Sequence, residues 1–122
     1  MIVDTDILID HFHGNADATA FVREALLRGE PMLISIATVS ELLAGIRPGE
    51  EQATDALLSL FRIYAADEVV ARIAGTFLNR YGRQYSLDLG DPLIAATARE
   101  TGSTLYTRNL RHYPMTDILV KA

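Results

Sequence analysis

Short apolar segments alternate with longer helical patterns along the whole chain. Met1–Asp4 and Met32–Ile36 are brief apolar runs typical of buried strands, whereas residues 16–29 and Asp67–Tyr81 carry apolar residues at helical spacing. Strands that alternate with helices form a parallel sheet, because each connecting helix returns the chain to the same end of the sheet. The pattern predicts an α/β fold in one domain, residues 1–122, with a mostly parallel central sheet of about four to five strands between two layers of helices.

The carboxyl ends of the expected strands carry polar residues. A helix is also expected in the ILIDHF segment after Asp6, and the other expected elements are helices over Thr38–Ile46, 50–62 and Asp91–Thr101 and strands over Ile63–Ala66, Thr104–Tyr106 and Ile118–Val120. In a doubly wound sheet, sites form outside the carboxyl ends of the strands, where the strand order reverses. We therefore expect one edge to gather the polar residues at these ends, which are Asp4, Glu41, Asp67, Asp91 and Asn109.

Composition excludes several classes of protein. The chain has no cysteine, so neither a disulfide framework nor a thiolate metal site is available. The apolar run at residues 32–39 is too short to span a bilayer, and the N-terminus lacks the basic and apolar regions of a signal peptide, so we expect a cytoplasmic protein without a membrane partner. The net charge of −5 argues against nucleic-acid binding but does not exclude it, because Lys121 is the only lysine and arginines contact phosphate well.

Each acid at the expected edge has a purely structural explanation. Asp4 precedes a helical segment and is suited to cap it. The segment Thr38–Glu41 fits the capping-box pattern, in which a Glu three residues after Ser or Thr closes a helix start. Asp91 is followed by Pro92, which favours the first helical turn. Capping alone would account for each acid taken separately.

Their joint placement indicates a metal site as a second explanation. Carboxylates crowded together cost free energy unless a proton or a cation neutralises them. Oxygen ligands without cysteine suit Mg²⁺ or Mn²⁺. A doubly wound fold also collects its helix caps on one edge, so spacing alone leaves both explanations open. Among nearby residues, Arg108 and Arg111 flank Asn109 and are candidates for binding a substrate phosphate or belong to a solvated loop, while His11, His13 and His112 are expected to be solvated.

Four segments together resemble a known family. They are IVDTDILID at residues 2–10, IATVSELLAG at residues 36–45, DPLIAATA at residues 91–98 and LYTRNLRHY at residues 105–113. In this order and spacing they resemble the PIN-domain ribonucleases, in particular the VapC-type toxins of toxin–antitoxin pairs. The resemblance covers nearly the whole chain and implies a PIN-like fold.

The resemblance also implies roles for individual residues. Asp4, Glu41 and Asp91 match the three acids that bind Mg²⁺, or Mn²⁺ in its place, and hold the water that attacks an RNA phosphodiester. The remaining candidate site residues, with a supporting or substrate-binding role, are Thr5, Asp6, Arg108, Asn109 and Arg111. Asn109 lies near the place where many members carry a fourth acid, and the amide puts a second metal ion in doubt. Asp67 is expected to be a helix cap only.

The family also implies partners. These are an RNA substrate, a short antitoxin encoded alongside that covers the cleft, and a second copy of the chain in a homodimer. Residues 42–61 would supply an apolar surface for antitoxin or dimer contacts, and the same residues would also serve as ordinary core.

Three alternatives remain. A haloacid-dehalogenase-type phosphatase would use Asp4 as its nucleophile, but Ile7 replaces the usual glycine and the required internal lysine is missing. A receiver-type phospho-acceptor needs a helix after its lysine, and the chain ends one residue after Lys121. A PIN domain that binds RNA or a partner without cleaving is the third.

Overall fold

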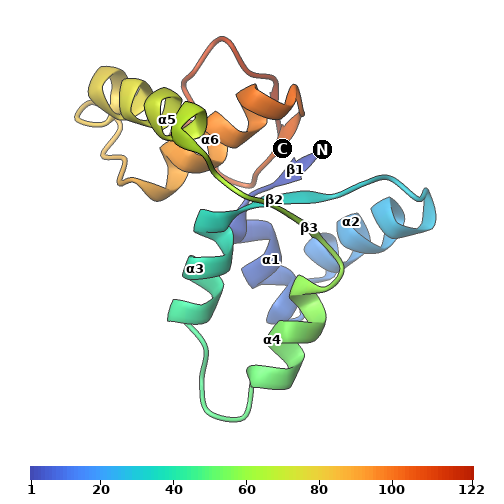
Figure 1. Cartoon of the computed structure of the whole chain (residues 1–122). Coiled ribbons are helices and arrows are strands. Elements are labelled where there is room, and N and C mark those ends of the chain that lie inside the picture. Colours follow the sequence, from blue (N-terminus) through green and yellow to red (C-terminus); the bar gives the residue numbers. More distant parts are fainter.

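The computed structural model describes residues 1–122, in which six α-helices and five short strands alternate (Figure 1). The strands are β1 (Ile2–Val3), β2 (Leu33–Ser35), β3 (Arg62–Tyr64), β4 (Leu105–Tyr106) and β5 (Val120–Lys121). The helices are α1 (Thr5–Phe12), α2 (Ala16–Leu27), α3 (Ile36–Ala44), α4 (Glu51–Leu58), α5 (Glu68–Tyr81) and α6 (Gly90–Thr101), and a 3₁₀ turn, η1, covers Leu110–His112. None of the helices has the length and apolar character needed to cross a lipid bilayer.

The five strands form one sheet in the order β3-β2-β1-β4-β5, and all four strand pairs are parallel. The chain therefore adds β2 and then β3 on one side of β1. It then crosses back and adds β4 and β5 on the other side of β1. This reversal places the topological switch point between β1 and β4, where Ile2 pairs with Leu105 and Val3 with Tyr106. The predicted α/β architecture is confirmed, with a sheet that is wholly parallel.

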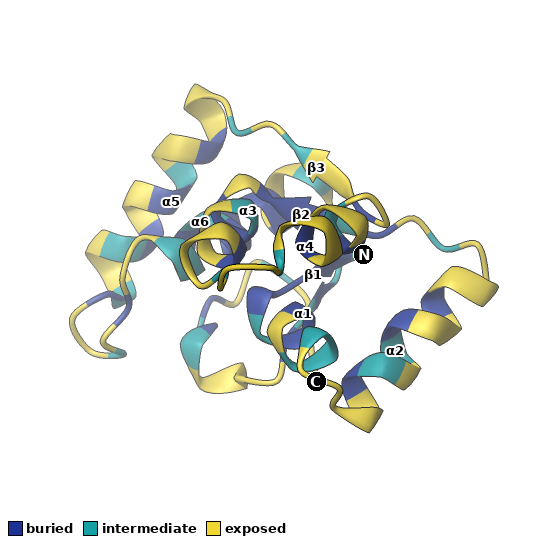
Figure 2. Ribbon diagram, turned by 90° about the horizontal axis from the view of Figure 1, so that it is seen from below, coloured by how far each residue is buried: buried dark blue, intermediate teal, exposed yellow.

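Helices cover both faces of the sheet, because side chains alternate along each strand. Ile2 points into a core shared with α5 and α6, whereas its neighbour Val3 points into a second core shared with α1 and α2. Both residues are fully buried. Figure 1 shows the strands between the helical layers, and Figure 2 shows buried residues on the inner faces of the helices and exposed residues on their outer faces. The result is a three-layer sandwich with the sheet between two hydrophobic cores.

Side-chain caps begin four of the six helices, and Asp4, which caps α1, is described with the site below. Asn15 accepts from Ala18 N for α2, Ser35 accepts from Ala37 N for α3, and Asp67 accepts from Val70 N for α5. The Ser35 cap makes α3 begin at Ile36, two residues earlier than expected from the sequence. The cap at Asp67 confirms the sequence-based prediction.

Candidate active site

Asp4 lies at the switch point, where β1 passes into α1. Its backbone N–H donates to Tyr106 O of β4 over 2.9 Å, which ties the ends of the two strands together. Its carboxylate accepts from Thr5 N and from the Thr107 hydroxyl, each over 2.7 Å. The side chain is only 5% exposed. Asp4 therefore caps α1, as predicted from the sequence, and also presents a buried carboxylate at the carboxyl edge of the sheet.

Glu41 reaches the same edge from α3. The Thr5 hydroxyl contacts two groups of this helix, donating to Glu41 Oε1 over 2.7 Å and lying 3.0 Å from Thr38 Oγ1. The capping-box interpretation of Thr38–Glu41 is wrong, because the helix already begins at Ile36 and both residues lie inside it. Glu41 is thus free of any capping role and is held by the residue that follows Asp4.

Asp91 comes from the first turn of α6, and it does not cap that helix. The residue before the helix is Leu89, which makes no side-chain cap, and Gly90 N donates to Asp88 Oδ1 over 3.1 Å. Asp91 Oδ1 instead accepts from the Tyr113 hydroxyl over 3.3 Å, and Asp91 Oδ2 lies 3.0 Å from His112 Nδ1. The helix-cap interpretation of Asp91 is therefore wrong, and its carboxylate points toward the segment after β4.

Asp6 adds a fourth carboxylate with an unsatisfied atom. Its Oδ2 accepts from the backbone N–H of Arg108 over 2.9 Å and lies 3.3 Å from the Thr107 hydroxyl. Its Oδ1 is buried and has no hydrogen-bond partner. A buried carboxylate oxygen without a partner is costly, so this atom points to a missing donor or cation.

Burial and mutual repulsion raise the pKa of all four carboxyl groups. Burial, followed by the charge of Asp6, raises the pKa of Asp4 to about 7. Burial is also the main reason why the pKa values of Asp6, Glu41 and Asp91 are raised. Neighbouring carboxylates add to each shift, since Asp91 acts on Glu41 and Asp6 acts on Asp91. The cluster is therefore short of positive charge.

The chemistry of these donors fits a hard divalent cation. Asp4, Glu41 and Asp91 offer carboxylate oxygens, and Asp6 Oδ1 is the orphaned oxygen beside them. A cation would remove the repulsion that raises their pKa values. No three Asp, Glu or His side chains are gathered tightly enough in this structure to enclose an ion, so the carboxylates would have to move together to bind one.

Of the remaining predicted site residues, the side chain of Arg108 is engaged in polar contacts, whereas those of Asn109 and Arg111 are not. The Arg108 guanidinium lies 3.2 Å from Asp10 and donates to Asn15, so it fastens the segment after β4 to α1 and α2. Asn109 is exposed, and only its backbone is engaged: its N–H donates to the Thr107 hydroxyl, and its carbonyl accepts from His112 N. Arg111 is exposed and makes no ion pair. Of the two arginines, only Arg111 is available to a phosphate.

Four functional contacts were missed by reasoning from the sequence. His112 was expected to be solvated, yet its ring contacts Asp91. Tyr113 and Thr107 bind Asp91 and Asp4, and both lie in the segment quoted for the family resemblance without being singled out. Asp88 raises the pKa of both Glu41 and Asp91. Its place three residues before Asp91 was the only available signal.

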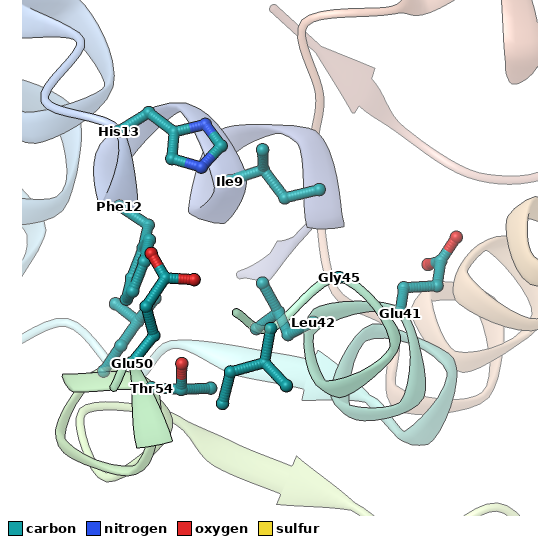
Figure 3. A pocket seen from close by; sticks show the side chains of 10 residues that line it. Ile9, Phe12, His13, Glu41, Leu42, Gly45, Glu50 and Thr54 are labelled. Atoms are coloured by element: carbon teal, nitrogen blue, oxygen red, sulfur yellow. The ribbon is translucent and has the colours of Figure 1, made fainter. Parts of the chain in front are cut away.

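An apolar groove of about 200 Å³ begins beside Glu41 and runs between α1, α3 and α4 (Figure 3). Its walls include Ile9 and Phe12 from α1, Leu42 from α3 and Leu57 from α4. In Figure 3, Glu41 lies at one end of the groove and Phe12 and Glu50 lie at the other. The groove and the carboxylate cluster therefore share one residue, Glu41.

Comparison with known proteins identifies the family and supports the fold. The PIN domain family profile matches residues 1–116. Ribonuclease VapC10 of Mycobacterium tuberculosis is 40% identical over 116 residues, covering 94% of this chain and 86% of the relative. Ribonuclease VapC19 of the same organism is 37% identical over 115 residues, covering 93% and 92%. A solved toxin–antitoxin complex from Klebsiella pneumoniae contains a chain with a TM-score of 0.76 and 30% identity, covering 99% of this chain and 95% of that one.

The solved relative thus shares the α/β sandwich over almost the whole chain. The chain belongs to the PIN-domain family of VapC ribonucleases. The family resemblance inferred from the four sequence segments is confirmed, and neither the phosphatase nor the receiver alternative is favoured.

Proposed function

We propose that the chain is a metal-dependent endoribonuclease that hydrolyses RNA phosphodiester bonds and serves as the toxin of a cytoplasmic toxin–antitoxin pair. The observation that carries the proposal is the convergence of Asp4, Glu41 and Asp91 on one charge-deficient edge of the sheet. The names of the relatives support the ribonuclease activity. The orphaned oxygen of Asp6 supports the dependence on a cation.

In this proposal the three acids bind the ion, and two threonines position the acids. Asp4, Glu41 and Asp91 would hold Mg²⁺ or Mn²⁺, and the bound ion would lower the pKa of a water and neutralise charge on the phosphate. Thr107 and Thr5 hold the carboxylates of Asp4 and Glu41 in place through hydrogen bonds of 2.7 Å.

Three further residues complete the proposed site. Tyr113 donates to Asp91 from the buried side of the cluster. The exposed guanidinium of Arg111 would bind a backbone phosphate of the RNA. Asp6, with one oxygen bound to Arg108 N, would support the ion from beside Asp4.

The first experiment measures RNA cleavage by the protein purified alone, with Mg²⁺ or Mn²⁺ and with EDTA. Asp91→Asn should abolish cleavage and Asp67→Asn should not, because Asp67 only caps α5. Hydrolysis of an aryl phosphate without RNA cleavage would replace the proposal with the phosphatase. Cleavage by the Asp91→Asn variant in EDTA would overturn it.

We also propose that the groove beside Glu41 receives an apolar segment of the antitoxin. The structural relative is described as a toxin–antitoxin complex, which supports such a partner. A segment lying in the groove would end at Glu41, where a basic side chain could neutralise the carboxylates and block the cleft. Antitoxin binding would thereby inhibit cleavage.

Co-purification with the protein encoded alongside tests this contact. Ile9→Glu places a charge in the groove and should abolish co-purification, whereas Leu27→Glu on the outer face of α2 should not. Equal retention by both variants would contradict the groove assignment. Light scattering of the free protein tests the proposed homodimer.

A further inference from the structure

His112 is a nitrogen donor that faces the carboxylate cluster. It ends the 3₁₀ turn after β4, and its Nδ1 lies 3.0 Å from Asp91 Oδ2. The side chain is 40% exposed, so one side of the ring is open to solvent and the other faces Asp91. His11 is engaged elsewhere, with its Nδ1 3.0 Å from Thr19 Oγ1. His112 is thus the histidine that the fold brings to this edge.

We propose that His112 is a ligand of the divalent ion and makes the site prefer Mn²⁺ to Mg²⁺. This inference rests on the proposed function and refines it. Mg²⁺ is bound through oxygen ligands and keeps several waters, so a nitrogen ligand adds little to its affinity. Transition ions accept imidazole nitrogen more readily. A site with three carboxylates and one imidazole therefore discriminates between the two ions where an all-oxygen site would not.

The distance between His112 and Asp91 suits coordination of one ion by both side chains. Neighbouring ligand atoms of an octahedral ion with bonds of about 2.1 Å are about 3.0 Å apart. The separation between His112 Nδ1 and Asp91 Oδ2 is 3.0 Å, so the two atoms can bind one ion without moving apart. The ring proton would sit on Nε2, which is the neutral tautomer that leaves the Nδ1 lone pair free.

Neighbouring residues support this role. Tyr113 directly follows His112 and is bonded through its hydroxyl to Asp91, so it fixes the distance between the 3₁₀ turn and α6. Tyr113 is 5% exposed and is part of the core beside α5 and α6. Asn109, three residues earlier, has an exposed side chain with no hydrogen bond. Thr107 and Tyr113 bring hydroxyl oxygens to the cluster from the same segment, and His112 adds an imidazole nitrogen to them.

A simple hydrogen bond from His112 to Asp91 is the competing explanation, and spectroscopy separates the two. Pulsed electron paramagnetic resonance of bound Mn²⁺ detects ¹⁴N coupling only when a nitrogen ligates the ion. We expect this coupling in the wild-type protein and in His11→Gln, and its loss in His112→Gln. Calorimetric titration should show at least about a tenfold weaker Mn²⁺ affinity in His112→Gln, with little change for Mg²⁺.

The outcomes are distinct. Loss of ¹⁴N coupling and of Mn²⁺ preference in His112→Gln alone supports the inference. Mn²⁺ bound without ¹⁴N coupling in a wild-type protein that cleaves RNA would overturn the inference and leave the proposed function intact. Cleavage in EDTA with no binding of either ion would overturn both. Circular dichroism of His112→Gln confirms that the variant is folded.

Discussion

Asp4 combines two tasks that make opposite demands on its charge. As the cap of α1 it accepts a hydrogen bond from Thr5 N, which stabilises the fold. As a buried carboxylate among other acids it has a pKa of about 7, against an ordinary value of 3.8. The folded state thus holds a proton that the unfolded chain has lost. In the absence of metal, the ionised form of Asp4 destabilises the protein.

The sign of this effect predicts the behaviour of Asp4→Asn. Because the pKa is raised on folding, the penalty is absent below about pH 4, grows between pH 4 and 7, and is complete above pH 7. An amide has no charge to bury and keeps one acceptor for Thr5 N. Metal-free Asp4→Asn should be more stable than wild type by on the order of a few kcal/mol at pH 8, and no more stable at pH 3.5.

Urea unfolding in EDTA at the two pH values measures this difference, and the same variant should not cleave RNA. An Asp4→Asn protein that is less stable than wild type at pH 8 would show that ionised Asp4 does not destabilise the fold. If Asp4→Asn is more stable than wild type and does not cleave RNA, Asp4 lowers the stability of the fold and is needed for activity.

At the scale of the elements, the residue between β3 and α5 has only a structural role. Asp67 begins α5 by accepting from Val70 N over 3.0 Å, and it does not enter the causes of any raised pKa in the carboxylate cluster. Asp67→Ala should lower the free energy of unfolding by about 1 kcal/mol and leave cleavage unchanged. Chemical denaturation beside an RNA cleavage assay tests both parts, and a loss of cleavage in the folded variant would contradict the purely structural role.

Gly90 begins α6 against Glu41. A Cβ at this position would lie 3.1 Å from Glu41 Oε2, so the Glu41 carboxylate would have to shift by a few tenths of an ångström, whereas its distance of 3.4 Å from Asp88 Oδ1 is an ordinary contact. The backbone needs no positive φ here, and alanine favours a helix. Gly90→Ala should therefore keep or raise stability while weakening metal binding and cleavage.

Thermal unfolding and Mn²⁺ titration of the variant measure the two effects. Gly75→Ala is a matched control, because a Cβ there meets nothing within 4 Å. Unchanged metal affinity in Gly90→Ala would show that Glu41 has room to move without loss.

At the scale of the whole molecule, the site joins segments from opposite ends of the chain. Thr107 binds Asp4 across more than a hundred residues of sequence, while Glu41 and Asp91 arrive from α3 and α6. Two hydrophobic cores hold these elements on either face of the sheet. A cation bound at their meeting point would therefore link segments that unfold together.

Metal binding should consequently raise the stability of the entire fold, by about 2.7 kcal/mol at a free concentration a hundred times the dissociation constant. The gain should be larger at pH 8 than at pH 5, because protons compete for Asp4 below its pKa of about 7. Calorimetry with Mg²⁺ and Mn²⁺ at both pH values tests this expectation. Asp91→Asn should abolish the shift, and an equal shift at both pH values would contradict the competition with protons.

The order of the elements could be predicted from the sequence, because apolar periodicity and capping residues are local properties. The parallel sheet and the cap at Asp67 were predicted correctly for this reason. The predicted start of α3, Thr38, lies two residues after the observed start, Ile36. The sequence did not reveal that Ser35 is the residue that caps the start of this helix.

The sequence by itself determined the layered α/β fold, the family and the strand ends on which acids lie. Only the tertiary structure decided the surroundings of those acids. It buried Asp4, Glu41 and Asp91 beside other carboxylates, which raises their pKa values, and it brought His112 to Asp91. The physical reason is that capping depends on a few neighbouring residues, whereas burial, repulsion and cross-chain hydrogen bonds depend on the positions of segments far apart in sequence.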